Sequence, residues 1–124
     1  MKVIKEVLSD AHAMAERGSW ISATNRAYYA MFYAAQHYLT ERHFTETRNL
    51  KTQKGTAQKF NELAIVRDGL PKNLGQQLSS ATQVRTKFDY DFDGEGPSER
   101  DARDMLAVAD HFVTTVLEAA RARP

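Results

Sequence analysis

The sequence predicts an all-α fold, a four- to five-helix up-and-down bundle. Five stretches repeat apolar residues at the three- and four-residue spacing of a helix, and none alternates apolar and polar residues as a strand does. The chain has 124 residues and carries no internal repeat, low-complexity tract or long linker. This length fits one hydrophobic core, so we expect a single domain over residues 1–124.

The first two predicted helices are separated by a glycine. Apolar residues recur at helical spacing over residues 3–14, and Gly18 stands where a helix often ends with a left-handed residue. Ser19 is then the expected N-cap of a second helix over about residues 20–42. Residues 27–35 of that helix are apolar or aromatic on every side, so we expect it to be the central helix or to lie partly under a second subunit.

Three more helices are predicted in the second half of the chain. One begins near Thr52, and Asp68, Gly69 and Pro71 mark its end. The next has Pro71 in its first turn and an inner stripe made of Leu74, Leu78, Ala81, Arg85 and Phe88. After a glycine-rich loop, Ser98 and Asp101 predict an N-terminal cap for the last helix. Its core stripe is Ala102, Met105, Leu106, Ala109, Phe112, Val113, Val116, Leu117 and Ala120.

Composition excludes several classes of protein. Cysteine is absent, which removes disulfides and thiolate metal sites and favours a cytoplasmic location. The longest apolar run, residues 27–35, is about half of what a bilayer requires, and the N-terminus has no secretory pattern, so we expect no membrane contact. No metal-ligand spacing, phosphate loop or nucleophile elbow is found, so the sequence predicts neither a metal nor a cofactor.

Charge is nearly balanced over the whole chain, with 17 Lys and Arg against 16 Asp and Glu. Binding of nucleic acid would therefore need a local patch. Residues 51–89 supply a candidate, because their basic side chains outnumber Glu62, Asp68 and Asp89. The basic residues are Lys51, Lys54, Lys59, Arg67, Lys72, Arg85 and Lys87. A solvated surface without a ligand remains the alternative.

Two arginines lie inside apolar stretches, where a guanidinium must be paired, extended to solvent or functional. We expect Arg26 to be structural, a buried arginine that ties helices together and bonds to Ser22 or to a carboxylate on a neighbouring helix. Arg85, with Asp89 and Tyr90, could bind an anion such as a phosphate, because arginine presents a fork of donors. An internal Arg85–Asp89 salt bridge is the alternative.

Tyrosines and alanines alternate along the second predicted helix. Tyr28 and Tyr29 stand between Ala27 and Ala30, an arrangement of large and small residues that close helix packing requires. We therefore expect these tyrosines to pack in the core or in a dimer interface. Stacking of bases on their rings is the alternative.

Three segments together resemble the HEPN family, in its branch of small stand-alone proteins. Residues 22–35, with Arg26 before Tyr28 and Tyr29, resemble the second-helix signature of that branch. Residues 51–55 resemble its basic, glycine-containing start of the next helix, and residues 85–91 resemble its arginine followed by an Asp-Tyr pair. The resemblance implies a homodimer. Proteins of this branch are often encoded beside a minimal nucleotidyltransferase, and the family includes ribonuclease toxins.

The resemblance also locates the candidate site. Ribonuclease members carry an arginine followed a few residues later by a histidine, and here that arginine would be Arg85. The positions open to the histidine are Tyr90, Asp91 and Phe92, and none is histidine. The resemblance thus makes Arg85, Asp89 and Tyr90 the candidate catalytic residues. The same resemblance implies RNA or nucleotide binding by Arg85, Lys51 and Lys54, and makes Tyr90 a possible acceptor of nucleotide from a partner transferase.

Three functions remain open from the sequence. The preferred one is a HEPN-like module that binds nucleotide or RNA, pairs with a minimal nucleotidyltransferase in a toxin-antitoxin-type system, and cleaves weakly or not at all. The second is a metal-independent RNase toxin that uses Arg85. The third is a purely structural dimerisation protein.

Overall fold

The structure, a computed structural model, describes residues 2–50, 52–89 and 94–122. In order along the chain, its helices are α1 (Lys2–Glu16), α2 (Trp20–Thr47), α3 (Gln53–Lys59), the π-helix η1 (Phe60–Arg67), α4 (Lys72–Asp89) and α5 (Glu99–Arg121). These residues include no β-strand. The all-α bundle predicted from the sequence is therefore confirmed.

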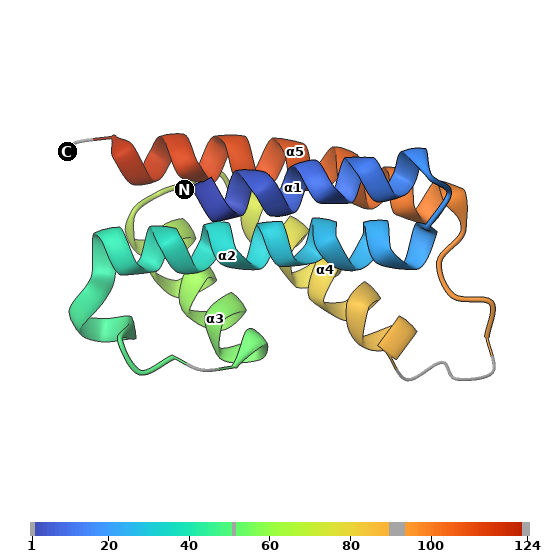
Figure 1. The fold of residues 1–124 in the computed structure, drawn as a ribbon. Coiled ribbons are helices and arrows are strands. Elements are labelled where there is room, and N and C mark those ends of the chain that lie inside the picture. The colour runs from blue at the N-terminus through green and yellow to red at the C-terminus, as the bar shows by residue number, and fades with distance from the viewer. Residues whose placement is uncertain (1, 51, 90–93, 123–124) are drawn as a thin grey trace.

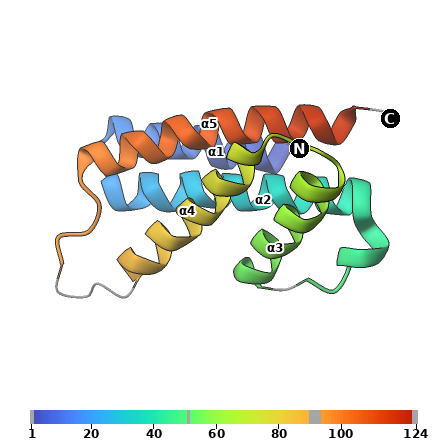
Figure 2. The same ribbon diagram turned by 180° about the vertical axis from the view of Figure 1, so that it is seen from behind.

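Helix α2 is the centre of the fold. It contacts every other helix of the chain. The long helices α1 and α5 run along one side of it (Figure 1), and α3, η1 and α4 cross its other side (Figure 2). This arrangement explains why residues 27–35 are apolar all round: only Tyr29 and Tyr33 among them keep appreciable exposure. None of the helices described is long and apolar enough to cross a membrane.

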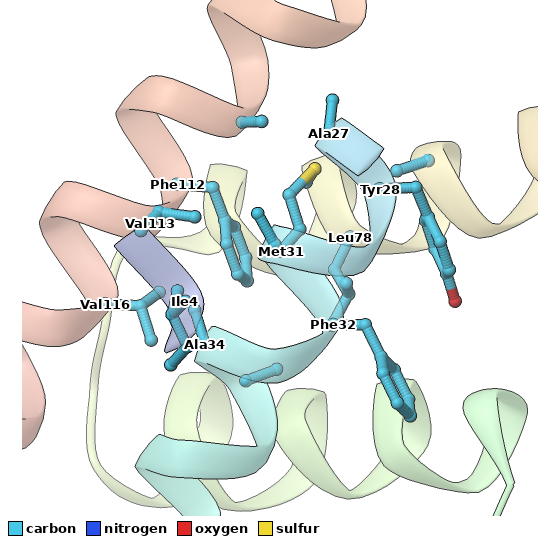
Figure 3. Packing of buried hydrophobic residues seen from close by; sticks show 14 of the residues in the cluster. Ile4, Ala27, Tyr28, Met31, Phe32, Ala34, Leu78, Phe112, Val113 and Val116 are labelled. Carbon is cyan, nitrogen blue, oxygen red and sulfur yellow. The ribbon is translucent and has the colours of Figure 1, made fainter. Parts of the chain in front are cut away.

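The core forms where α5, α2 and α1 meet. Phe112, Val113 and Val116 of α5 pack towards Met31 of α2 and Ile4 of α1 (Figure 3). Every residue of the stripe predicted for the last helix is buried: Ala102, Met105, Leu106, Ala109, Phe112, Val113, Val116, Leu117 and Ala120. Burial of such a continuous stripe is the main stabilising contribution to a helix of this kind.

Three predicted helix boundaries can be checked at atomic detail. Gly18 has φ 74°, the left-handed conformation expected after α1. Ser98 and Asp101 form a complete capping box: Asp101 N donates to Ser98 Oγ at 3.1 Å, and Ser98 N donates to Asp101 Oδ2 at 3.0 Å. Ser19 occupies the N-cap position of α2, but its side chain makes no capping hydrogen bond.

The structure departs from the expected periodicity at two places. Helix α2 continues to Thr47, but His43 has non-helical angles (φ −143°, ψ 44°), so the expected end near Arg42 coincides with a kink. The third helix becomes π-helical after Lys59. Its backbone hydrogen bonds then join residues five positions apart, as where Asp68 N donates to Leu63 O. A π-turn is a local rearrangement that apolar spacing does not predict. Helix α4 starts at Lys72, directly after Pro71.

A polar cluster fixes the kink of α2 against the end of η1. The Tyr38 hydroxyl donates to the Asp68 carboxylate, and His43 Nε2 lies 2.7 Å from Asp68 Oδ2. Arg67 Nη1 also donates to both carboxylate oxygens of Glu46, at 2.9 and 3.0 Å. Burial and the bond to Asp68 raise the pKa of Tyr38. Burial tends to raise the pKa of Asp68, but the hydrogen bonds from Tyr38 and His43 outweigh it and lower that pKa.

Candidate functional site

Arg85 lies on the face of α4 that is turned towards α2. Its guanidinium carbon is 4.4 Å from the ring centre of Tyr29 and 5.4 Å from that of Tyr28. Such contacts attract a cation to the ring faces by about 0.5–2 kcal/mol, depending on exposure. The two rings thus hold a half-buried guanidinium in a defined orientation. Because the guanidinium is planar, donors at its edge can point away from a ring on which it stacks.

Tyr28 connects three helices at this point. Its ring is fully buried and meets the Tyr29 ring edge-on, with ring centres 5.5 Å apart. Its hydroxyl donates to Oε1 of Gln53, the first residue of α3, at 3.1 Å. In Figure 3, Tyr28 projects from α2 on the side away from Phe112 and α5. The start of α3 and the last two turns of α4 are therefore joined through one buried tyrosine.

A groove between α3 and α4, here called the α3–α4 groove, is lined by residues adjacent in sequence to this junction: Lys54 follows Gln53, and Thr86 follows Arg85. Its volume is about 790 Å³. Of the described residues that line it, those with charge are both lysines, Lys54 of α3 and Lys87 of α4. The remaining lining is mostly amides and hydroxyls, namely Gln58, Asn61, Ser79, Thr82, Gln83 and Thr86, with Ala57. Ammonium and amide donors of this kind suit a polyanionic ligand.

Comparison with known proteins places the chain in a family. The model of the HEPN domain matches residues 5–119. The chain belongs to the HEPN family. The resemblance seen in the sequence is thereby confirmed, and the match extends beyond the three segments that suggested it.

Two known relatives align with this HEPN chain over most of its length. The UPF0332 protein glr0978 of Gloeobacter violaceus is 26% identical over 114 residues, which cover 92% of this chain and 87% of that protein. A protein of Methanocaldococcus jannaschii with the name "Putative toxin MJ0605" is 29% identical over 120 residues, 96% of this chain and 84% of the relative. No solved structure gives a significant match.

The structure brings together only part of the site that the sequence predicts for this HEPN protein. Arg85, Tyr28 and Tyr29 are in mutual contact, and Lys54 lines the adjacent groove. Lys51 and Tyr90 lie outside the described residues. Asp89 is the last residue of α4, and its side chain is also outside the described part. The roles assigned to these three residues remain predictions.

The burial expected for Arg26 is not observed. Its side chain is exposed, because Arg26 lies on the surface of α2 that faces solvent beside α1. There it borders a hollow with Val3, Val7, Tyr29 and Tyr33. Neither the expected bond to Ser22 nor an ion pair with a neighbouring carboxylate is present among the described residues. The hydrogen bond and the ion pair that the expected structural role of Arg26 required are therefore not observed among the described residues.

Sequence reasoning missed the partners of Tyr28 and of three histidines. Gln53 accepts a hydrogen bond from Tyr28, which no local pattern predicts because the residues lie 25 positions apart. His12, His43 and His111 contact Asp110, Asp68 and Gln77 respectively. The contacts of His12 and His111 each join two helices, and that of His43 joins α2 to the residue that follows η1. Within the described ranges, no group of three His, Cys, Asp or Glu side chains could hold a metal ion.

Proposed function

We propose that this HEPN protein is a nucleotide- or RNA-binding module of a toxin-antitoxin-type system, the partner of a minimal nucleotidyltransferase, and that it cleaves RNA weakly or not at all. The observation that carries the proposal is the Arg85 guanidinium stacked on Tyr29 at 4.4 Å, beside a groove with two lysines. Membership of the HEPN family and the toxin name of one relative support the system to which we assign it.

Phosphate binding is the chemistry that these residues suit best. An arginine oriented by rings loses little side-chain freedom when it bonds an anion, and it can bond phosphate through two parallel N–H donors. Lys54 and Lys87 add positive charge without a competing carboxylate in the described lining of the groove. A strand of RNA could thus bond Arg85 through one phosphate and follow the groove with its neighbours.

Rapid cleavage would need a proton carrier as well as an arginine. The positions that would supply the family's histidine are Tyr90, Asp91 and Phe92. Tyrosine has an ordinary pKa of about 10 and aspartate of about 4, so neither exchanges protons efficiently near neutral pH. The proposal therefore expects binding with slow or absent cleavage.

The test is the affinity for a fluorescein-labelled single-stranded RNA, measured by anisotropy. Replacement Arg85→Ala should weaken binding by about tenfold or more, because a charge-assisted bond to phosphate is lost. Lys59→Ala is the matched control: it also removes a cation, but Lys59 pairs with Glu62 at 3.3 Å and does not line the groove. Equal affinity of the parent and Arg85→Ala proteins would contradict the proposal.

The alternatives give different results with the same samples. An RNase toxin that uses Arg85 predicts rapid breakdown of the labelled RNA on a denaturing gel, abolished by Arg85→Ala. A purely structural dimerisation protein predicts no RNA binding by either protein, together with a dimer mass in light scattering. A mass near 14.0 kDa would exclude the homodimer that we also expect.

The partner can be tested through Tyr90. A minimal nucleotidyltransferase would transfer adenylate from ATP to the tyrosine hydroxyl and release pyrophosphate. Mass spectrometry of the protein after incubation with such an enzyme and ATP should show one added adenylate, and Tyr90→Phe should abolish it. An adenylate that persists in Tyr90→Phe would show that another residue is the acceptor.

A further inference from the structure

A second groove runs along the opposite flank of α4, between α4 and α5, and is here called the α4–α5 groove. Its volume is about 410 Å³. Its floor is apolar and is made of Ala81, Val84, Met105 and Val108. Ala81 and Met105 are buried, whereas Val84 and Val108 are only half-buried although they pack against the core. The floor therefore offers apolar surface that the fold itself leaves uncovered.

The charges along this groove are opposite to those of the α3–α4 groove. Of the described residues that line it, those with charge are Asp101 and Asp104, both on α5. Asp104 is exposed, and Asp101 is held by the capping box at the start of α5. The hydrogen bonds from Ser98 lower the pKa of Asp101, which keeps its carboxylate charged at neutral pH. Such a rim attracts cations and repels the phosphates of a nucleic acid.

The shape of the groove is elongated. Its α4 wall follows one line of the helix from Asn73 through Ser80 to Val84, which is about 16 Å at 1.5 Å per residue. Its α5 wall extends from Asp101 to Val108, about 10 Å. The side-chain amide of Gln77 also lies 3.3 Å from His111 Nδ1, which connects the two walls. These dimensions fit two to three turns of a helix rather than a compact ligand.

We propose that the α4–α5 groove is a docking site for an amphipathic helix of a partner protein, with apolar side chains on Val84 and Val108 and lysine or arginine side chains beside Asp101 and Asp104. Charge complementarity favours this occupant. The acidic rim repels RNA, and the apolar floor offers no ligands for a small cation. The surface lies on the other flank of α4 from the lysine-lined groove. The inference is therefore independent of the proposed RNA binding.

The test uses a defined probe: a fluorescein-labelled peptide of about 16 residues, helical, with leucines three and four residues apart and lysines on both sides. A matched peptide carries glutamates in place of the lysines. We expect the lysine peptide to bind the parent protein at micromolar concentration and the glutamate peptide to bind at least about tenfold more weakly.

Two variants locate the binding. Asp104→Lys should weaken binding of the lysine peptide by about tenfold. Glu118→Lys makes the same charge change at an exposed site of α5 outside the groove, and it should change the affinity less than about twofold. Ser80→Arg, which adds bulk and a cation at an exposed position of the α4 wall, should also weaken it. Unchanged circular dichroism melts of these variants would show that they fold.

Three results would overturn the inference. The first is that the parent binds neither peptide, and the second is that Asp104→Lys and Glu118→Lys weaken binding equally. The third is that Asp104→Lys changes the mass in light scattering, which would make the occupant a second copy of this chain. RNA affinity of the same variants distinguishes this inference from the proposed function, because Asp104→Lys should not weaken RNA binding.

Discussion

The two grooves beside α4 differ in charge and in lining although they share a helix. The α3–α4 groove is bordered by Lys54 and Lys87 and is lined mainly by amides and hydroxyls. The α4–α5 groove is bordered by Asp101 and Asp104 and has an apolar floor. A third face of α4, with Leu74, Leu78 and Arg85, turns towards the centre of the bundle. Helix α4 thus lies between the core and two grooves of opposite charge, to which its neighbours α3 and α5 contribute Lys54 and the two aspartates, and the RNA and the helix that we propose as ligands would occupy different grooves.

Reversal of the lysine charges should have the largest effect. The double variant Lys54→Glu and Lys87→Glu should weaken RNA binding by about a hundredfold, because two attractive contacts with phosphates become repulsive. Its affinity for the lysine peptide should not fall, since no residue that lines the α4–α5 groove is changed and the loss of the positive Lys87 charge near Asp101 makes that rim more acidic. Anisotropy with both labelled probes measures this. A parallel loss of both affinities would show that the two grooves are not separate sites.

A substitution away from both grooves should change stability and neither affinity. Tyr38→Phe removes the hydrogen bond to the Asp68 carboxylate, and we expect the free energy of unfolding to fall by about 1–3 kcal/mol. Urea unfolding followed by circular dichroism gives the value. If RNA or peptide binding fell with it at a temperature where the variant is folded, the grooves would depend on the kink of α2.

The same cluster predicts a dependence on pH. The folded-state pKa of Asp68 is lowered, so its contribution to stability is fully present above its unfolded pKa of about 3.9 and is lost as the pH falls through the folded value. Unfolding free energies measured from about pH 6 down to pH 3 should therefore decline less steeply in Asp68→Asn than in the parent. Identical slopes would mean that other carboxylates cause the loss of stability at low pH.

Arg26→Ala should have the smallest effect. An exposed arginine without a hydrogen bond or ion pair among the described residues contributes less than about 0.5 kcal/mol to the stability of one subunit. A thermal melt at low protein concentration checks this expectation. A larger loss that appears only at high concentration would instead place Arg26 in a homodimer interface with Tyr29 and Tyr33.

Much of the fold could be predicted because it depends on local patterns. The α5 stripe, the left-handed Gly18 and the Ser98 cap follow from spacing and from backbone preferences over a few residues. The grooves could not be predicted in this way. They depend on how α4 packs against η1 and α5. Gly75 allows α4 to lie close to η1, because a side chain at this position would meet Asn61 and Ile65 of η1.

The candidate site was predictable in its centre and not in its surroundings. Arg85 was recognisable because an arginine in an apolar stripe needs a specific environment, and its contact with Tyr28 and Tyr29 provides one. Lys87 could be assigned only to a basic stretch, because its place opposite Lys54 requires the fold. Arg26 was assigned wrongly to the interior, since the apolar residues around it in the sequence face both the core and an outer hollow.

The salt dependence of RNA binding tests the central claim, that Arg85 and the two lysines bind phosphates, most directly. The logarithm of the affinity should fall linearly with the logarithm of the salt concentration, and each phosphate contact of a single strand contributes about 0.7 to the slope. Arg85→Ala, Lys54→Ala and Lys87→Ala should each flatten the slope by about this amount, whereas Lys59→Ala should leave it unchanged. A slope that is the same in all five proteins would contradict the account.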